Sequence, residues 1–121
     1  MQSLLKTGLA LVLLACNAQP VSEEHAAAAK LLTQAYEGQK LEAFVAGSDC
    51  LALVIHAGTR LDDSLVESMQ YGTGHYVAFG GIEAFAEKRR FRAVVYRDAA
   101  ERLWTYGAVS LEEARSMPRC S

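Results

Sequence analysis

The stretch RFRAVVYRDAAERLWTYGAV, residues 90–109, decides how this chain folds. In residues 90–97 apolar side chains recur at alternate positions, which is the period of a β-strand with one buried face. The four residues Asp-Ala-Ala-Glu that follow supply a turn. Residues 102–109 then return as a second strand that carries Trp104 and Tyr106 on one face. The stretch therefore predicts an antiparallel β-hairpin in the last third of the chain.

The residues before this hairpin predict a helix and a second hairpin. Ser22 is a good N-cap, two glutamates follow it, and an alanine-rich amphipathic run continues toward a stop at Gly38. Residues 40–46 and 50–57 are apolar segments joined by Gly-Ser-Asp, which is typical of a β-turn. The alternative is that the first helix continues through Gly38 into residues 41–45, at a cost of about 1 kcal/mol for the glycine.

Shorter elements fill the rest of the chain. Asp62 starts a short helix that ends near Gly72, and residues 75–79 form either a short strand or a loop between glycines. Residues 82–88 read as one or two helical turns, and Ser110 opens a last short helix with capping-box spacing. The order of elements predicts an α+β fold, with a small antiparallel sheet and all helices packed on one side of it.

The N-terminus predicts export and lipid anchoring. A single lysine precedes an apolar run that is too short to remain as a membrane-spanning helix, since spanning needs about 20 residues. The run ends in Leu-Leu-Ala-Cys, which resembles a bacterial lipobox with Cys16 as the lipidated residue. We therefore expect residues 1–15 to be a lipoprotein signal peptide, residues 16–21 a lipidated cysteine with a spacer, and residues 22–121 one domain. An ordinary signal cleaved near Ala18 is the alternative.

Composition limits the partners of this domain. The formal net charge is −2 with acids and bases interspersed, whereas a nucleic-acid binder needs a basic excess. We expect the lipid to place the protein in the bacterial outer membrane on its periplasmic side, because asparagine and not aspartate follows Cys16. The expected partners are the membrane, through the anchor, and another envelope protein.

Cys50 and Cys120 are the two cysteines left after the anchor. In an oxidising compartment they favour a disulfide, which would stabilise the domain by roughly 4 kcal/mol through loop closure. Two free thiols are the alternative. Neither these cysteines nor His25, His56 and His75 have metal-ligand spacing, so we expect no metal or cofactor, and the histidines to lie at the surface or at strand edges.

Catalytic patterns do not occur in the sequence, and we expect no enzymatic activity. The paired glycines at 72–74 and 80–81 have neither P-loop nor dinucleotide-binding spacing and are expected to be hinges. Arg90 and Arg92 belong to a basic concentration that either contacts lipid phosphates or, as we favour, forms a solvated strand face. Trp104 and Tyr106 form either an exposed aromatic patch with Tyr96 or part of the core.

One resemblance covers about forty residues by pattern. Residues 82–85, residues 90–98, the returning strand 102–109 and the late Cys120 are similar to the end of the pilotin lipoproteins of type II secretion. The shared order is a lipidated cysteine, a helix, a strand pair, a helix and a hairpin. In that family the first bridging cysteine lies on the middle helix, whereas Cys50 here precedes it.

The resemblance implies a chaperone-like function, in which apolar residues of the first helix and the sheet grip a helical tail of a secretion-system outer-membrane subunit. The second hypothesis is a periplasmic inhibitor or immunity lipoprotein that uses the segment from Gly72 to Gly81, with His75 and Tyr76 as its contact residues. A structural envelope lipoprotein is the third. All three are non-enzymatic binding modules or scaffolds.

Overall fold

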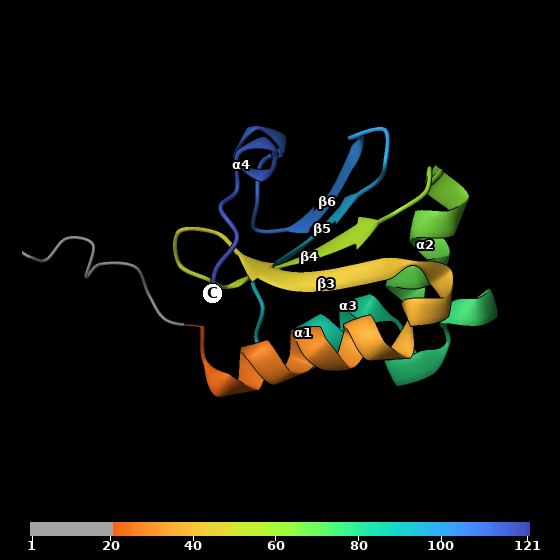
Figure 1. Cartoon of the computed structure of the whole chain (residues 1–121), viewed down its shortest axis with the longest axis horizontal. Helices are drawn as coiled ribbons and strands as arrows, with labels where there is room; N and C mark the ends of the chain where they lie inside the picture. Colours follow the sequence, from red (N-terminus) through yellow and green to blue (C-terminus); the bar gives the residue numbers. More distant parts are fainter. Residues whose placement is uncertain (1–20) are drawn as a thin grey trace, which may run out of the picture.

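The computed structural model describes residues 21–121, which form a four-stranded sheet with helices on both faces. The strands are β3 (Leu41–Ala46), β4 (Ala52–Ala57), β5 (Ala93–Arg97) and β6 (Leu103–Gly107), and they lie side by side in that order (Figure 1). The α+β class and both predicted hairpins are confirmed.

The sheet is mixed, so the expectation of an antiparallel sheet was wrong for its central pair. β4 and β5 run parallel, with His56 opposite Arg97. The chain leaves β4, passes through α2 (Asp63–Tyr71) and α3 (Ile82–Lys88), and returns at the end from which β4 started. A crossover of this kind joins parallel neighbours, whereas a tight turn joins antiparallel ones. The sequence pattern identified each hairpin but not how the two are joined.

The first helix, α1 (Glu23–Ala35), begins as predicted. The Ser22 hydroxyl accepts a 3.0 Å hydrogen bond from the backbone N–H of His25, and the helix buries Ala28 and Leu32 against the sheet. The alternative of a continuous helix into residues 41–45 is excluded. A 3₁₀ turn over Glu37–Gln39 and a left-handed Lys40 instead lead the chain into β3.

The helices lie in two layers, which corrects the expectation that all pack on one side. α1, α2 and α3 cover the face that carries Leu53, Ile55 and Tyr96, where the larger core forms. The last helix, α4 (Leu111–Arg115), packs Ala114 against a smaller apolar cluster on the opposite face (Figure 1). Ser110 caps α4 by accepting from the N–H of Glu113, as its capping-box spacing predicted.

The segment between α2 and α3 is a loop and not a strand. It consists of two single 3₁₀ turns, Gly74–Tyr76 and Ala78–Gly80. Strand β5 begins at Ala93 and not at residue 90, because Arg90 has a left-handed backbone (φ 65°) and the N–H of Phe91 still bonds to the carbonyl of Ala86 at the end of α3.

The predicted disulfide between Cys50 and Cys120 is present, with a Cα–Cα distance of 6.0 Å. It holds the C-terminal segment beside the outer edge of β3. There the N–H of Cys120 donates to the carbonyl of Val45, and the N–H of Gly47 donates to the carbonyl of Pro118, both at 2.9 Å. The C-terminus thus completes an edge that would otherwise present unpaired backbone groups.

Candidate functional site

The loop of residues 72–81 has a closed neck made by two glycines. Gly72 and Gly81 have positive φ values of 78° and 98°, and their backbones touch. A Cβ atom built on Gly81 would lie 2.7 Å from the amide nitrogen of Gly72, and one on Gly72 would lie 2.7 Å from the amide nitrogen of Gly81. The loop therefore leaves and rejoins the domain at one point, as an Ω-loop does.

The inner side of this loop is fixed by aromatic contacts. The ring of Tyr36 lies 5.5 Å from that of Tyr76 and 6.5 Å from that of Phe79, and the Tyr36 hydroxyl donates to the carbonyl of Ala78 at 3.4 Å. Phe79 also packs edge-on against Phe85, at 5.0 Å between ring centroids. Burial raises the pKa of both Tyr36 and Tyr76 above the usual value, so both remain neutral donors.

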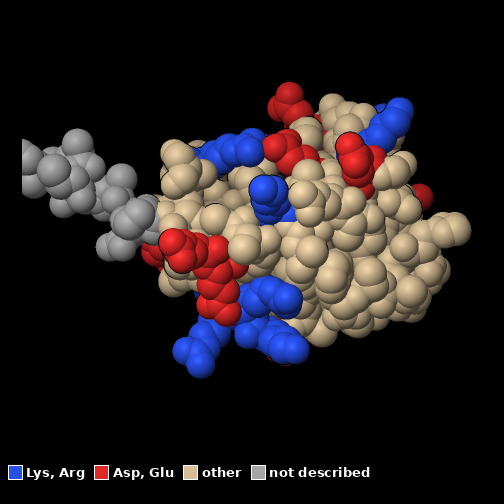
Figure 2. All heavy atoms as spheres, turned by 60° about the horizontal axis from the view of Figure 1, so that its bottom comes forward, with Lys and Arg blue, Asp and Glu red and all other residues tan. Residues whose placement is uncertain are grey.

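The outer side of the loop exposes apolar side chains. Val77 is 63 % and Phe79 39 % exposed on the loop, Tyr71 is 53 % exposed at the end of α2 directly before Gly72, and we call these three residues the loop patch. Residues 71–82 contain no Asp, Glu, Lys or Arg. On the face shown in Figure 2, the lower right is uncharged, and it lies toward the end of the molecule where Figure 1 places the loop. Exposed apolar side chains within an uncharged part of the surface favour an interaction site.

The sequence-based candidates in this loop are divided between surface and core. His75 is exposed, but Tyr76 is buried against Tyr36. The exposed contact residues are Val77 and Phe79, which the sequence analysis did not select. Phe79 adopts a left-handed backbone with φ 62°, a conformation that is costly for an aromatic residue and common at binding sites. The twelve-residue absence of charge was the signal that could have identified them.

A second candidate surface is the groove between α1 and β3, with a volume of about 330 Å³. Ala26, Ala29 and Thr33 of α1 form one wall, and β3 and the C-terminal residues 119–121 form the other. We call it the α1–β3 groove. It lies where the pilotin resemblance expects a groove, on the first helix and the sheet.

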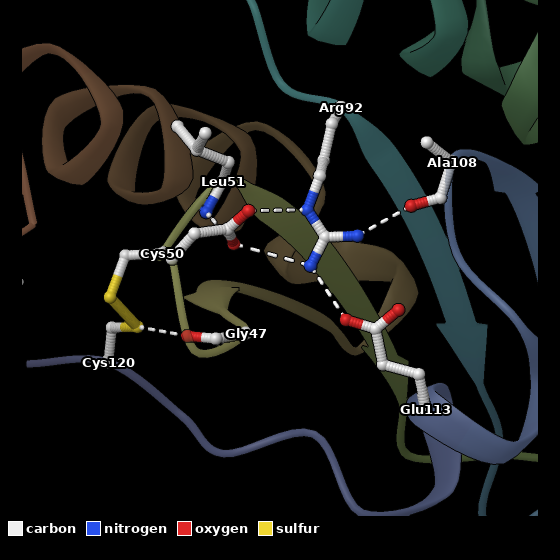
Figure 3. A network of polar contacts seen from close by, with 8 residues as sticks. Gly47, Cys50, Leu51, Arg92, Ala108, Glu113 and Cys120 are labelled. Carbon is white, nitrogen blue, oxygen red and sulfur yellow. Dashed lines mark hydrogen bonds and ion pairs between the residues drawn. A yellow bond between two sulfur atoms is a disulfide. The ribbon is translucent and has the colours of Figure 1, made fainter.

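Arg92 is a structural tie and is not available to a partner (Figure 3). Its Nε donates to Asp49 at 2.7 Å, its Nη2 to Glu113 at 2.7 Å, and its Nη1 to the carbonyl of Ala108 at 2.5 Å. The bonds to Glu113 and Asp49 raise the pKa of Arg92, and the bond from Arg92 lowers that of Asp49. Arg90 is exposed and joins none of these contacts.

Trp104 and Tyr106 are half-buried and anchor α2 to the sheet. The indole N–H of Trp104 donates to Asp63 at 2.8 Å, and the ring of Tyr106 meets that of Tyr71 edge-on at 6.5 Å. Tyr96 is fully buried in the core, and its hydroxyl donates to Gln70. Tyr96 therefore belongs to the core, whereas Trp104 and Tyr106 are partly exposed. Tyr106 contacts Tyr71, which is part of the loop patch.

The three histidines do not converge. His25 is buried, with its Nε2 2.8 Å from the carbonyl oxygen of Arg89 and its ring 4.2 Å from that of Phe91, so the surface expectation was wrong for it. His56 lies on β4 and His75 on the loop. Within residues 21–121 the structure contains no group of three or more side chains able to hold a metal ion.

The predicted signal peptide and the lipidated Cys16 lie outside the described residues. In the part of the chain that the structure describes, no helix is both long and apolar enough to cross a bilayer. Comparison of the chain with known protein families, with curated proteins and with solved structures finds no match.

Proposed function

We propose that this protein is a lipid-anchored, non-enzymatic binding module of the bacterial cell envelope. Cys16 would anchor it in the outer membrane on the periplasmic side, and the loop patch would bind another envelope protein. The observation that carries the proposal is the exposure of Val77 and Phe79 on a loop that is held rigidly from behind, and of Tyr71 at the end of α2 beside the neck of that loop.

Two physical arguments support the loop patch as the contact. A loop with a closed neck and a packed inner side loses little conformational freedom on binding, so more of the contact energy remains as affinity. Aromatic side chains that fill a pocket in the partner dominate binding energy in many interfaces. The partner should present an apolar pocket, because residues 71–82 offer no charged side chain. This arrangement suits an inhibitor or immunity lipoprotein that blocks an envelope-attacking enzyme.

The α1–β3 groove favours a second function, that of a pilotin-like chaperone. Its occupant would be an amphipathic helix of a secretion-system outer-membrane subunit, laid with its apolar face against Ala26 and Ala29. Lys30 lines the same groove and suits an acidic residue flanking that helix, whereas Arg119 is already paired with Glu42. The groove includes Val21, five residues after Cys16, so a helix in it would lie within about 18 Å of the lipid attachment point.

The decisive experiment places a photocrosslinking residue at position 75 in the loop, or at position 30 in the α1–β3 groove, of the full-length protein in its own envelope, and compares capture by variants at positions 77, 26 and 111. Leu111 is the matched control, because it is 44 % exposed and lies on α4, across the sheet from both surfaces. Val77→Asp should abolish the crosslink from the loop, and Leu111→Asp should leave it unchanged. If instead Ala26→Glu abolishes capture and Val77→Asp does not, the chaperone hypothesis replaces the inhibitor. Equal capture by all variants would refute both surfaces.

Anchoring is tested separately by labelling with palmitate. Cys16→Ser should leave the protein unlabelled and release it from the membrane fraction. A Cys16→Ser protein that still incorporates palmitate would contradict the assignment of the anchor.

A further inference from the structure

The face of the sheet opposite the loop patch carries a hollow. It has a volume of about 780 Å³ and lies between α4 and the ends of β4 and β5. Its lining residues include His56 and Gly58 from β4 and its end, Arg97 and Ala99 from β5 and its end, and Arg115 of α4. We call it the arginine hollow.

The position of the arginine hollow follows from the parallel pair. Because β4 and β5 run in the same direction, their carboxyl ends meet at one edge of the sheet, where His56 lies opposite Arg97. The chain then departs in different directions, toward α2 after β4 and into the turn before β6 after β5. Crevices at the carboxyl ends of parallel strands are the usual ligand sites of sheets that contain them.

The two guanidinium groups of the hollow have no carboxylate partner. Among residues 21–121, Arg92, Arg102 and Arg119 form ion pairs with carboxylates, whereas Arg97 and Arg115 form none within 4.0 Å. Arg97 is half-buried between the ring of Phe44, 5.7 Å from its guanidinium carbon, and His56. Arg115 is exposed, but Arg97 is a partly desolvated cation without a counter-charge, which is unfavourable, and a bound anion relieves that cost.

The acidic residues of the hollow do not neutralise it. The Asp98 carboxylate is fully buried and accepts hydrogen bonds from the N–H groups of Leu61, Ala100 and Arg102 and from the Arg102 guanidinium. Its charge is therefore already paired with Arg102. Glu101 is exposed and is the one carboxylate of the lining that forms no ion pair, so two guanidinium groups outweigh it.

His56 adds a ring N–H group to the two cations. Its Nδ1 accepts a 3.5 Å hydrogen bond from Nε of Arg97, which leaves Nε2 as the nitrogen that can donate to a ligand. Guanidinium groups bind phosphate oxygens in pairs, and an imidazole N–H completes such a set. The hollow, with a volume of about 780 Å³, has room for a phosphate group together with an organic moiety attached to it.

We propose that the arginine hollow is a binding site for a phosphate-bearing small molecule, held by Arg97, Arg115 and the Nε2–H of His56. The phosphate group comes either from a free phosphate ester or from a lipid headgroup. This site is independent of the loop patch and of the α1–β3 groove, because it lies on the other face of the sheet.

Calorimetric titration of the full-length protein in a non-ionic detergent tests the site. Glycerol phosphate is the probe for a free ester, and dihexanoyl phosphatidylglycerol, below its micelle concentration, is the probe for a headgroup. We expect one of them to bind at a single site, with the tighter of the two identifying the source. Arg97→Gln and Arg115→Gln should each weaken binding at least tenfold, and Arg60→Gln, an exposed arginine outside the hollow, should change it less than twofold.

The His56 ring proton resonances provide a second measurement, and they should shift saturably with the same dissociation constant. Thermal melting of each variant shows whether it remains folded. Three results would overturn the proposal: no saturable binding of either probe, equal binding by Arg97→Gln and the wild type, or equal competition by sodium sulfate and sodium chloride at matched ionic strength. The last result would mean simple charge screening.

Discussion

Reduction of the Cys50–Cys120 disulfide should remove a large part of the stability of this domain. The two cysteines are separated by 70 residues, so the bridge closes most of the folded chain into one loop. Loop-closure entropy for a loop of this length predicts a loss of roughly 4 kcal/mol when the bridge is opened. A domain of this size has a total free energy of unfolding of about 5–15 kcal/mol. The melting temperature should therefore fall by on the order of 20 °C when the bridge is opened.

The loss should begin at the C-terminus. Without the covalent link, the segment beside β3 is held by the backbone bonds of Cys120 and Pro118 and by the exposed ion pair of Arg119 with Glu42. Exposed ion pairs contribute about 0–1 kcal/mol, so this segment should open before the rest of the sheet. Hydrogen exchange at the Cys120 amide should accelerate on reduction while that of the β4 amides changes only with global stability.

The assay is urea denaturation of the full chain, followed by the fluorescence of Trp104, the single tryptophan. We compare the oxidised protein, the protein with a phosphine reductant, and the Cys50→Ser/Cys120→Ser variant, which controls for effects of the reductant. The second and third should agree in stability and in denaturant slope, and their slope should exceed that of the oxidised protein, because the unfolded chain without the bridge exposes more surface. A loss below about 1 kcal/mol with an unchanged slope would refute the loop-closure argument.

Three further predictions concern single residues. Arg92→Met should destabilise the domain by only about 1–2 kcal/mol in urea denaturation, because the ion pairs of Arg92 are partly exposed. Arg92→Lys should recover less than half of this loss, since an ammonium group cannot reproduce the several directed hydrogen bonds of a guanidinium. No loss of stability in Arg92→Met would contradict a structural role for Arg92. Gly81→Ala should lower thermal stability by about 2 kcal/mol or more, whereas Gly38→Ala, whose added Cβ would meet no other atom, should be neutral. Equal effects of the two substitutions would contradict the close contact between Gly72 and Gly81. Burial alone would raise the pKa of Asp98, but hydrogen bonds lower it to about 2 from 3.8. Its contribution to the free energy of unfolding is therefore complete above about pH 5 and is lost as the pH falls toward 2. If the stability of Asp98→Asn runs parallel to that of the wild type between pH 5 and 2, this prediction is wrong.

The features that the sequence predicted correctly are local. Ser22, Asp62 and Ser110 each accept a hydrogen bond from an amide three residues ahead, and that interaction needs only the neighbouring chain. The two hairpins likewise depend on alternation and a turn. The parallel pairing of β4 with β5 and the position of α4 depend on how separate units pack, and no local pattern encodes them.

The candidate surfaces were predictable only in part. The glycine pairs identified the loop, but the choice of His75 and Tyr76 failed for Tyr76, because nothing near it in sequence reveals that Tyr36 would bury it. Arg92 looked like a surface cation because its carboxylate partners lie 43 and 21 residues away. The arginine hollow depends on Arg97 and Arg115, which belong to different elements and meet only in the folded chain.

The neck of the loop allows the sequence of the loop to change independently of the sequence of the rest of the domain. Because Gly72 and Gly81 touch, the helices on either side are joined at a fixed distance whatever lies between the glycines. Among the eight intervening residues, Tyr76 and Phe79 must keep their contacts with Tyr36, but the others can be exchanged or the loop lengthened with little cost, since closing a longer loop adds only about 0.6 kcal/mol per doubling. Recognition can therefore diverge without refolding the scaffold, and the same property makes this position suitable for grafting a foreign binding sequence.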